Sequence, residues 1–373
     1  MPEKLNVEMV VVAREAWGMT QRDLADATRI KPYKLSKFET GVGGLSDEDV
    51  DVIAYETGFR RHFFYRSDQL IGLGSSLLFN RRLKTTPIPV QRQVQARVNV
   101  VRLQLERMLA AAEMESAARI ERLDVQEYDG DARAVARRVR AALRLPMGPV
   151  QSVTKAIESC GGIVAICNFD AEQIDAAHIW VPGQHPMFFM NADRPGDRHR
   201  FNLAHELAHA VMHEFPTGDI EKQANEFAAE FLMPTEEIRP ELDGLTIEKA
   251  AKLKQRWRVS MKALIYNAHR LGCISDKRCR TLYAILRSML IKPKMEEPIK
   301  IAREDPTLIR QLIHLHRKGL GYGDEELREL LMMDDPEFLE LGEDCSLAPS
   351  PLRMPPAPIL FSDHLKRRAA GGE

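Results

Sequence analysis

Residues 205–209 read His205-Glu206-Leu207-Ala208-His209, and this stretch decides how the centre of the chain is interpreted. Two histidines four residues apart lie on one face of an α-helix, because four residues turn through about 400°. Their imidazoles can bind one metal ion, and Glu206 beside them can act as general base on a water molecule. The flanking residues are apolar or small, which predicts a buried helix. The alternative is a chance grouping of two histidines and a glutamate.

A third ligand is needed, because a catalytic zinc ion takes three protein ligands and keeps one position open. His213 follows one turn later, but it would have to reach back along the helix axis. Glu221 is the better candidate, because a second helix can begin at Asp219 and carries Asn225 one turn after Glu221. The amide oxygen of Asn225 can accept the outer N–H of a metal-binding histidine. The predicted site consists of the metal ligands His205, His209 and Glu221, the general base Glu206 and the supporting residue Asn225.

The N-terminal region contains the signals of short helices joined by tight turns. Thr20 can cap a helix, and Asp23 can return the hydrogen bond. Ala25 is the small residue that allows a second helix to approach closely, as in a helix-turn-helix. In such a motif the second helix lies in the major groove of DNA, where its basic residues contact phosphates.

Residues 5–66 resemble the Cro/repressor (XRE) family of helix-turn-helix proteins. The resemblance rests on Thr20-Gln21, on Ser36-Lys37-Phe38-Glu39-Thr40-Gly41, and on Phe59 with Phe63-Phe64. It implies binding to a double-stranded DNA operator. By position, the implied DNA contacts are Gln21, Lys31, Tyr33, Lys34 and Lys37. Residues 1–70 contain 10 Lys/Arg and 12 Asp/Glu, so contact with another protein is the alternative role of this module.

A long helix is predicted after the Gly-containing joint at 72–76. Its apolar residues recur in steps of four and three, the spacing of one helix face. This face can pack on the rest of the chain or form a coiled coil in a homodimer. The apolar residues are Val94, Val98, Val101, Leu105, Met108 and Ala112.

The whole chain is predicted to have an α+β fold that is mostly helical. Apolar segments at 163–166, 178–181 and 187–190 predict a small β-sheet before the active-site helix. A short helical piece is expected around 305–333, ahead of a mostly disordered tail. The expected parts are a helix-turn-helix domain at 1–68, a linker and long helix at 69–125, a zincin-like domain at 126–235, a helical region at 236–335 and a tail at 336–373.

The region from about 130 to 290 resembles the ImmA/IrrE family of metallopeptidases. Besides the His-Glu helix, the resemblance rests on Gly161-Gly162-Ile163-Val164, Ile174-Asp175, Ala192–Arg198 and the pattern from Ala224 to Pro234. It implies one Zn²⁺ per chain, for which Mn²⁺ can substitute, held by His205, His209 and Glu221 with Glu206 as base. Known members cleave a helix-turn-helix repressor, and a helix-turn-helix domain is often fused at their N-terminus. Ala208 departs from the glycine that is usual before the second histidine.

Composition restricts the remaining possibilities. The chain has five cysteines and no closely spaced Cys-x-x-Cys pair, which is typical of reduced thiols rather than disulfides or a cysteine zinc site. It has no apolar run of about 18 residues and no signal-peptide pattern, so we expect a cytoplasmic protein without a membrane partner. Residues 253–268 suggest a basic helix-turn-helix shape. They are interpreted as a solvated helical cap, with a second nucleic-acid contact as the alternative.

Two functions are therefore open. The first is a DNA-binding regulator with a zinc endopeptidase domain that cuts a repressor or antitoxin-like protein and so controls stress-response or mobile-element genes. The second is an XRE-family regulator or antitoxin whose zinc domain senses a signal or supports the fold.

Overall fold

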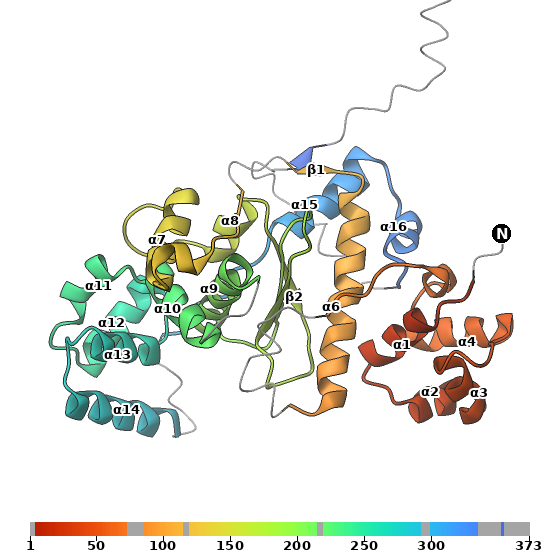
Figure 1. Cartoon of the computed structure of the whole chain (residues 1–373), viewed down its shortest axis with the longest axis horizontal. Helices are drawn as coiled ribbons and strands as arrows, with labels where there is room; N and C mark the ends of the chain where they lie inside the picture. The colour runs from red at the N-terminus through yellow and green to blue at the C-terminus, as the bar shows by residue number, and fades with distance from the viewer. Residues whose placement is uncertain are drawn as a thin grey trace, which may run out of the picture.

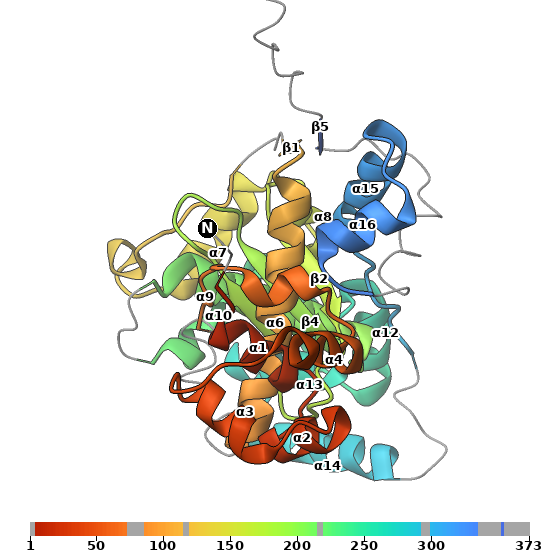
Figure 2. The same ribbon diagram turned by 90° about the vertical axis from the view of Figure 1, so that its right-hand side faces the viewer.

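A long helix, α6 (Ile88–Leu109), stands at the centre of the computed structural model, which describes residues 4–72, 86–114, 119–214, 219–291, 299–334 and 352–353. In Figure 1 this helix lies between the N-terminal helices on one side and a β-sheet on the other. Figure 2 looks onto the N-terminal helices, which lie in front of the lower part of α6, with the sheet behind. The described residues are mostly helical with a small sheet, which confirms the predicted α+β class at that level.

Local capping explains where the N-terminal helices begin and end. Thr20 and Asp23 form the predicted capping box at the start of the second helix, and Ser46 and Asp49 form the same box at the fourth. Gly58 ends the fourth helix with a φ of 69°, a left-handed conformation that favours glycine. The elements are α1 (Val7–Ala16), α2 (Gln21–Thr28), α3 (Pro32–Glu39), α4 (Asp47–Thr57) and the 3-10 turn η1 (Arg61–Tyr65).

The main sheet has three strands in the order β2 (Ile163–Cys167), β4 (Met187–Asn191) and β3 (Ala176–Ile179). The central strand β4 runs parallel to β2 and antiparallel to β3, so β3 forms an edge. Along β4, Phe188 and Met190 belong to one hydrophobic core, and Met187 and Phe189 belong to another. This alternation is the two-residue period of a strand, and it means that both faces of the sheet are covered.

Helices from distant parts of the chain cover the two faces. The core on one face contains α7 (Ala132–Ala142), α8 (Val153–Glu158), α9 (Gly196–Met212) and α10 (Ile220–Leu232). The core on the other face contains α6 and α15 (Leu308–His314). In the sequence, α6 precedes the three strands and α15 follows them. The His-Glu motif lies on α9 and is therefore held directly against the sheet.

Helix α6 buries apolar residues on two sides. Val94, Val98 and Leu105 pack with the sheet, whereas Val100 and Leu103 pack with the phenylalanines of the N-terminal region. The apolar stripe predicted from the sequence is thus buried within one chain. These residues therefore offer no free apolar face on which a coiled coil could form. The helix ends at Leu109, three residues before the predicted stripe ends, with its C-cap at Ala110.

The helices after α10 share its core. Buried side chains of one cluster extend from Ile120 to Leu286, so the packing continues across the expected domain boundary at 235/236. The wall formed by these helices lies beside α9 and α10 in Figure 1. Its elements are α11 (Thr235–Leu242), α12 (Ile247–Trp257), α13 (Met261–Arg270) and α14 (Asp276–Ile291).

Residues 299–334 return across the molecule to the N-terminal helices. Glu304 accepts hydrogen bonds from the Ser152 hydroxyl and the Thr154 N–H and forms an ion pair with buried Arg200. Further on, the Arg60 N–H donates to the Met332 carbonyl at 2.9 Å, directly after α16 (Asp324–Leu331). This return joins the N-terminal module to the rest of the fold.

The remaining elements are small: η3 (Val125–Tyr128), the π-helical turn η4 (Leu315–Gly319), and β1 (Glu113–Met114), which pairs antiparallel with β5 (Leu352–Arg353). Most of the predicted joint at 72–76 lies outside the described residues, and so does the expected disordered tail at 336–373 apart from 352–353. Among the described helices, none combines the length and the apolar character that crossing a membrane requires.

Candidate metal centre

Helices α9 and α10 bring three potential metal ligands together. One nitrogen each of His205 and His209 and one carboxylate oxygen of Glu221 lie within 4.8 Å of one another. The Nε2 atoms of the two histidines are 3.1 Å apart, and Glu221 Oε1 lies 3.2 Å from His209 Nε2. The structure therefore gathers the three residues that the sequence singled out, and His213 is not part of this group.

A chain of hydrogen bonds fixes the tautomer and the orientation of the His209 ring. The Gln223 side-chain oxygen accepts from His213 Nε2–H at 3.0 Å, which leaves His213 Nδ1 as an acceptor. His209 Nδ1–H donates to that atom at 2.9 Å. His209 Nε2 consequently carries a lone pair and points it toward His205 and Glu221. Two residues that the sequence did not assign, His213 and Gln223, thus do the orienting that metal ligands need.

The donor set fits a divalent metal ion. Burial lowers the pKa of both His205 and His209 to about 4, so both rings are neutral at pH 7, the form that binds metals. Burial also raises the pKa of Glu221, and its Oε1 atom is buried without a hydrogen-bond donor. A cation among these atoms would supply the partner that this oxygen lacks. Two imidazoles and one carboxylate are ligands that zinc accepts.

A residue of the sheet, to which the sequence analysis gave no role, holds Glu206 in place. His178 on the edge strand β3 donates from Nδ1 to Glu206 Oε2 at 2.7 Å, and both side chains are buried. Burial alone would raise the pKa of Glu206, but this hydrogen bond and the nearby imidazoles lower it to about 2. Glu206 is therefore a carboxylate at neutral pH, as a general base must be. The alternation of side chains along β3 places His178 on the face of the sheet that α9 covers. The sequence alone does not show this, because it depends on how β3 pairs with β4.

Asn225 lies on an exposed part of α10 beside the predicted ligands. Its amide N–H donates to the Glu221 carbonyl at 2.7 Å, and its side chain also hydrogen-bonds with His205. The residue is thus placed next to a predicted ligand, as expected from its spacing after Glu221. The partner that orients His209 is His213 rather than Asn225.

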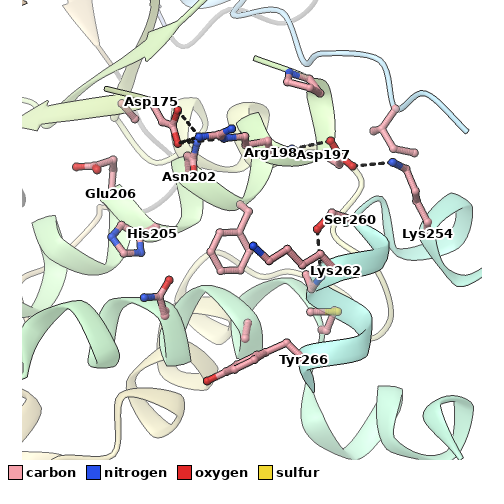
Figure 3. Close-up of a pocket in the computed structure, with 18 of the residues that line it drawn as sticks. Asp175, Asp197, Arg198, Asn202, His205, Glu206, Lys254, Ser260, Lys262 and Tyr266 are labelled. Carbon is pink, nitrogen blue, oxygen red and sulfur yellow. Dashed lines mark hydrogen bonds and ion pairs between the residues drawn. The ribbon is translucent and has the colours of Figure 1, made fainter. Parts of the chain in front are cut away.

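A large cleft opens in front of the site. It has a volume of about 1380 Å³ and is lined by His205 and Glu206 on one wall and by residues of α12 and α13 on the other. In Figure 3 the labelled side chains of α9 lie opposite Ser260, Lys262 and Tyr266. This space is large enough for a segment of peptide chain.

The five predicted DNA contacts differ in their surroundings. Gln21 donates to Glu39 at 2.8 Å, and Lys34 forms an ion pair with Asp49, so both have partners within the module. Lys31, Tyr33 and Lys37 are exposed, and Tyr33 leaves 60% of its surface to solvent. The structure thus presents three of the five side chains on an open surface.

Most of the cleft region lies in the part of the chain that is similar to a known protein family. No curated protein sequence matches the chain. Residues 159–269, from the strand β2 through α13, match a family model, and the N-terminal helices lie outside the matched segment. The matched segment contains all three potential metal ligands, Glu206 and His178. That family model is Peptidase_M78, the IrrE N-terminal-like domain, so this part of the chain is similar to a metallopeptidase domain of the ImmA/IrrE type.

Proposed function

We propose that the protein is a zinc-dependent endopeptidase joined to a DNA-binding helix-turn-helix module. The observation that carries the peptidase part is the convergence of His205, His209 and Glu221 beside a carboxylate, Glu206, at the wall of a large cleft. The similarity of residues 159–269 to a metallopeptidase domain supports the same conclusion. The substrate we propose is a helix-turn-helix repressor or antitoxin-like protein that controls stress-response or mobile-element genes.

The protein's own residues divide the work of hydrolysis. Zinc bound at His205, His209 and Glu221 would polarise the scissile carbonyl and acidify a water molecule. Glu206 takes the proton of the attacking water and passes it to the leaving amine. His178 holds one oxygen of Glu206, and Glu206 lines the cleft.

The N-terminal module is proposed to bind an operator through α3. Lys31, Tyr33 and Lys37 are exposed on or next to this helix, whereas α1 is the helix that packs on α6. A helix in the major groove presents such basic and aromatic side chains to phosphates and bases. DNA binding would then bring the peptidase to the gene whose regulator it cuts.

One observation favours the second function. Helix α6 packs on the sheet with one side and on the N-terminal core with the other, so it connects the two parts. A regulator that senses metal could use this connection without cutting any protein.

One experiment separates the two functions. Wild type and Glu206→Gln are purified, their zinc content is measured, and each is incubated with the helix-turn-helix repressor encoded next to the gene. Because Gln keeps the shape of the side chain but cannot accept the proton, we expect one zinc per chain in both proteins and cleavage only by wild type. Equal processing by both proteins, or none by wild type with zinc bound, would exclude Glu206-dependent cleavage of this repressor and favour the regulator.

A further inference from the structure

The wall of the cleft opposite the metal centre carries a row of polar side chains on α13. Lys262, Tyr266 and Arg270 follow one another at intervals of four residues, which places them on one face of the helix. All three line the cleft that also contains His205 and Glu206. Figure 3 shows Lys262 reaching from α13 toward the side of the cleft that holds His205, with Tyr266 below it.

The acidic side chains of the cleft outside the metal centre already have basic partners. Asp197 is paired with buried Lys254 at 2.7 Å, and Asp175 is paired with Arg198 at 2.6 Å. Glu226 is paired with Arg133 at 3.3 Å. None of these carboxylates is left over to neutralise α13.

Lys262 is different from these paired residues. Within the described part of the chain, no acidic group lies within ion-pair distance of its ammonium, and the Tyr266 hydroxyl has no hydrogen-bond partner either. One turn further, the Nη1 atom of Arg270 is buried without an acceptor. This face of α13 therefore offers unmatched donors and positive charge beside the reaction centre.

We propose that Lys262 and Tyr266 form a subsite for a carboxylate of the peptide in the cleft, so the enzyme selects acidic segments. The inference rests on the proposed peptidase function, because it places the subsite in the substrate cleft. An ammonium and a phenol one turn apart, about 6 Å along the helix, can both donate to one carboxylate. The carboxylate can come from an Asp or Glu side chain or from the C-terminus of the peptide.

The test uses peptide hydroxamates, which anchor to zinc and so hold a neighbouring side chain in the cleft. Three matched tripeptide amides, each with its hydroxamate group at the N-terminal end, carry Glu, Gln or Lys at one position, and each position is tested in turn. Dissociation constants are measured with zinc-loaded wild type, Lys262→Gln and Lys262→Glu. Lys222→Gln is the control, because Lys222 also lines the cleft, on α10, without an acidic partner among the described residues.

At one position, wild type should bind the Glu probe about tenfold more tightly than the Gln probe, as for a charge-assisted hydrogen bond in a partly open site. Lys262→Gln should remove this preference, Lys262→Glu should favour the Lys probe, and Lys222→Gln should keep the wild-type ratio. The preference should also shrink as salt is raised. Thermal melting of each variant shows that the fold is kept.

Other outcomes overturn the inference in distinguishable ways. Equal binding of Glu and Gln probes to wild type would remove the subsite and leave the peptidase proposal standing. An equal loss with Lys222→Gln would attribute the preference to the general charge of the cleft. If no probe binds zinc-loaded wild type, the metal centre is closed and both proposals fail. To identify the source of the carboxylate, free-acid and amidated peptides are compared on zinc-loaded Glu206→Gln; a preference for the free acid assigns the subsite to the C-terminus.

Discussion

The N-terminal module and the candidate metal centre place the side chains proposed to act in them in opposite surroundings. Lys31, Tyr33 and Lys37 lie open to solvent. His209 and Glu206, in contrast, are buried and held by His213 and His178. A surface site depends on charge and on what its partner brings, whereas a buried site depends on geometry that the chain itself enforces. Substitutions should therefore act through salt-sensitive affinity in the first region and through metal binding and acid stability in the second.

The largest effect is expected on DNA binding. Lys31→Glu combined with Lys37→Glu replaces the two proposed phosphate contacts by repulsive charges and should weaken binding to DNA from upstream of its own gene by about 10²–10³-fold. The salt dependence of the affinity should fall by about two ion equivalents. Fluorescence anisotropy over a salt series measures both. Lys34→Gln, at an implied contact whose charge is already paired with Asp49, should have a much smaller effect. Unchanged binding by the double variant would move DNA recognition away from α3.

The next effect is expected on zinc affinity. His213→Leu removes the acceptor that fixes the tautomer of His209, so zinc should bind about 10–100-fold more weakly. Competition with a chromogenic chelator at pH 7 gives the dissociation constant. The control is His185→Gln, because His185 contacts the Gly161 carbonyl and is not part of the metal centre. Wild-type affinity in His213→Leu would show that the hydrogen-bond chain does not support the ligand.

The smallest effect is expected on acid stability. His199 is buried on α9, and neither of its ring nitrogens has a hydrogen-bond partner among the described residues. Burial lowers its pKa from 6.5 to about 4, with Arg303 contributing. The unfolded chain therefore takes up this proton at higher pH than the folded one. The stability from neutral His199 is full above pH 6.5 and is lost as the pH falls toward 4.

Comparison of wild type with His199→Phe isolates this contribution. Phe keeps an aromatic ring at this position, cannot take up a proton and loses no hydrogen bond among the described residues. Between pH 7 and pH 5 the free energy of unfolding should therefore fall by about 1–2 kcal/mol less in the variant than in wild type. Urea unfolding at both pH values measures the difference. In the N-terminal module, hydrogen bonds from Thr20 lower the pKa of Asp23, so that cap persists through this window. Parallel pH curves for wild type and variant would show that His199 is not the acid-sensitive group.

Local spacing allowed much of the metal centre to be predicted. The positions of His205 and His209 on one helix face follow from helix geometry alone, and Glu221 followed from a turn and a new helix start. The capping box of Thr20 and Asp23 was readable for the same reason, since all its atoms lie within one turn. The match of residues 159–269 to a metallopeptidase domain agrees with the resemblance inferred from these motifs.

The rest required the tertiary structure, because it joins residues that are far apart in the chain. His178 meets Glu206 only because the pairing register of β3 with β4 places that side chain on the face of the sheet that α9 covers. Likewise, α6 was predicted as a helix with one apolar face, but only the packing showed that this face lies on the sheet of the same chain. The sequence by itself determined which groups can bind metal, since ligand chemistry and helix spacing are local. The fold decided which groups orient them and what faces the cleft, because long-range packing sets those contacts.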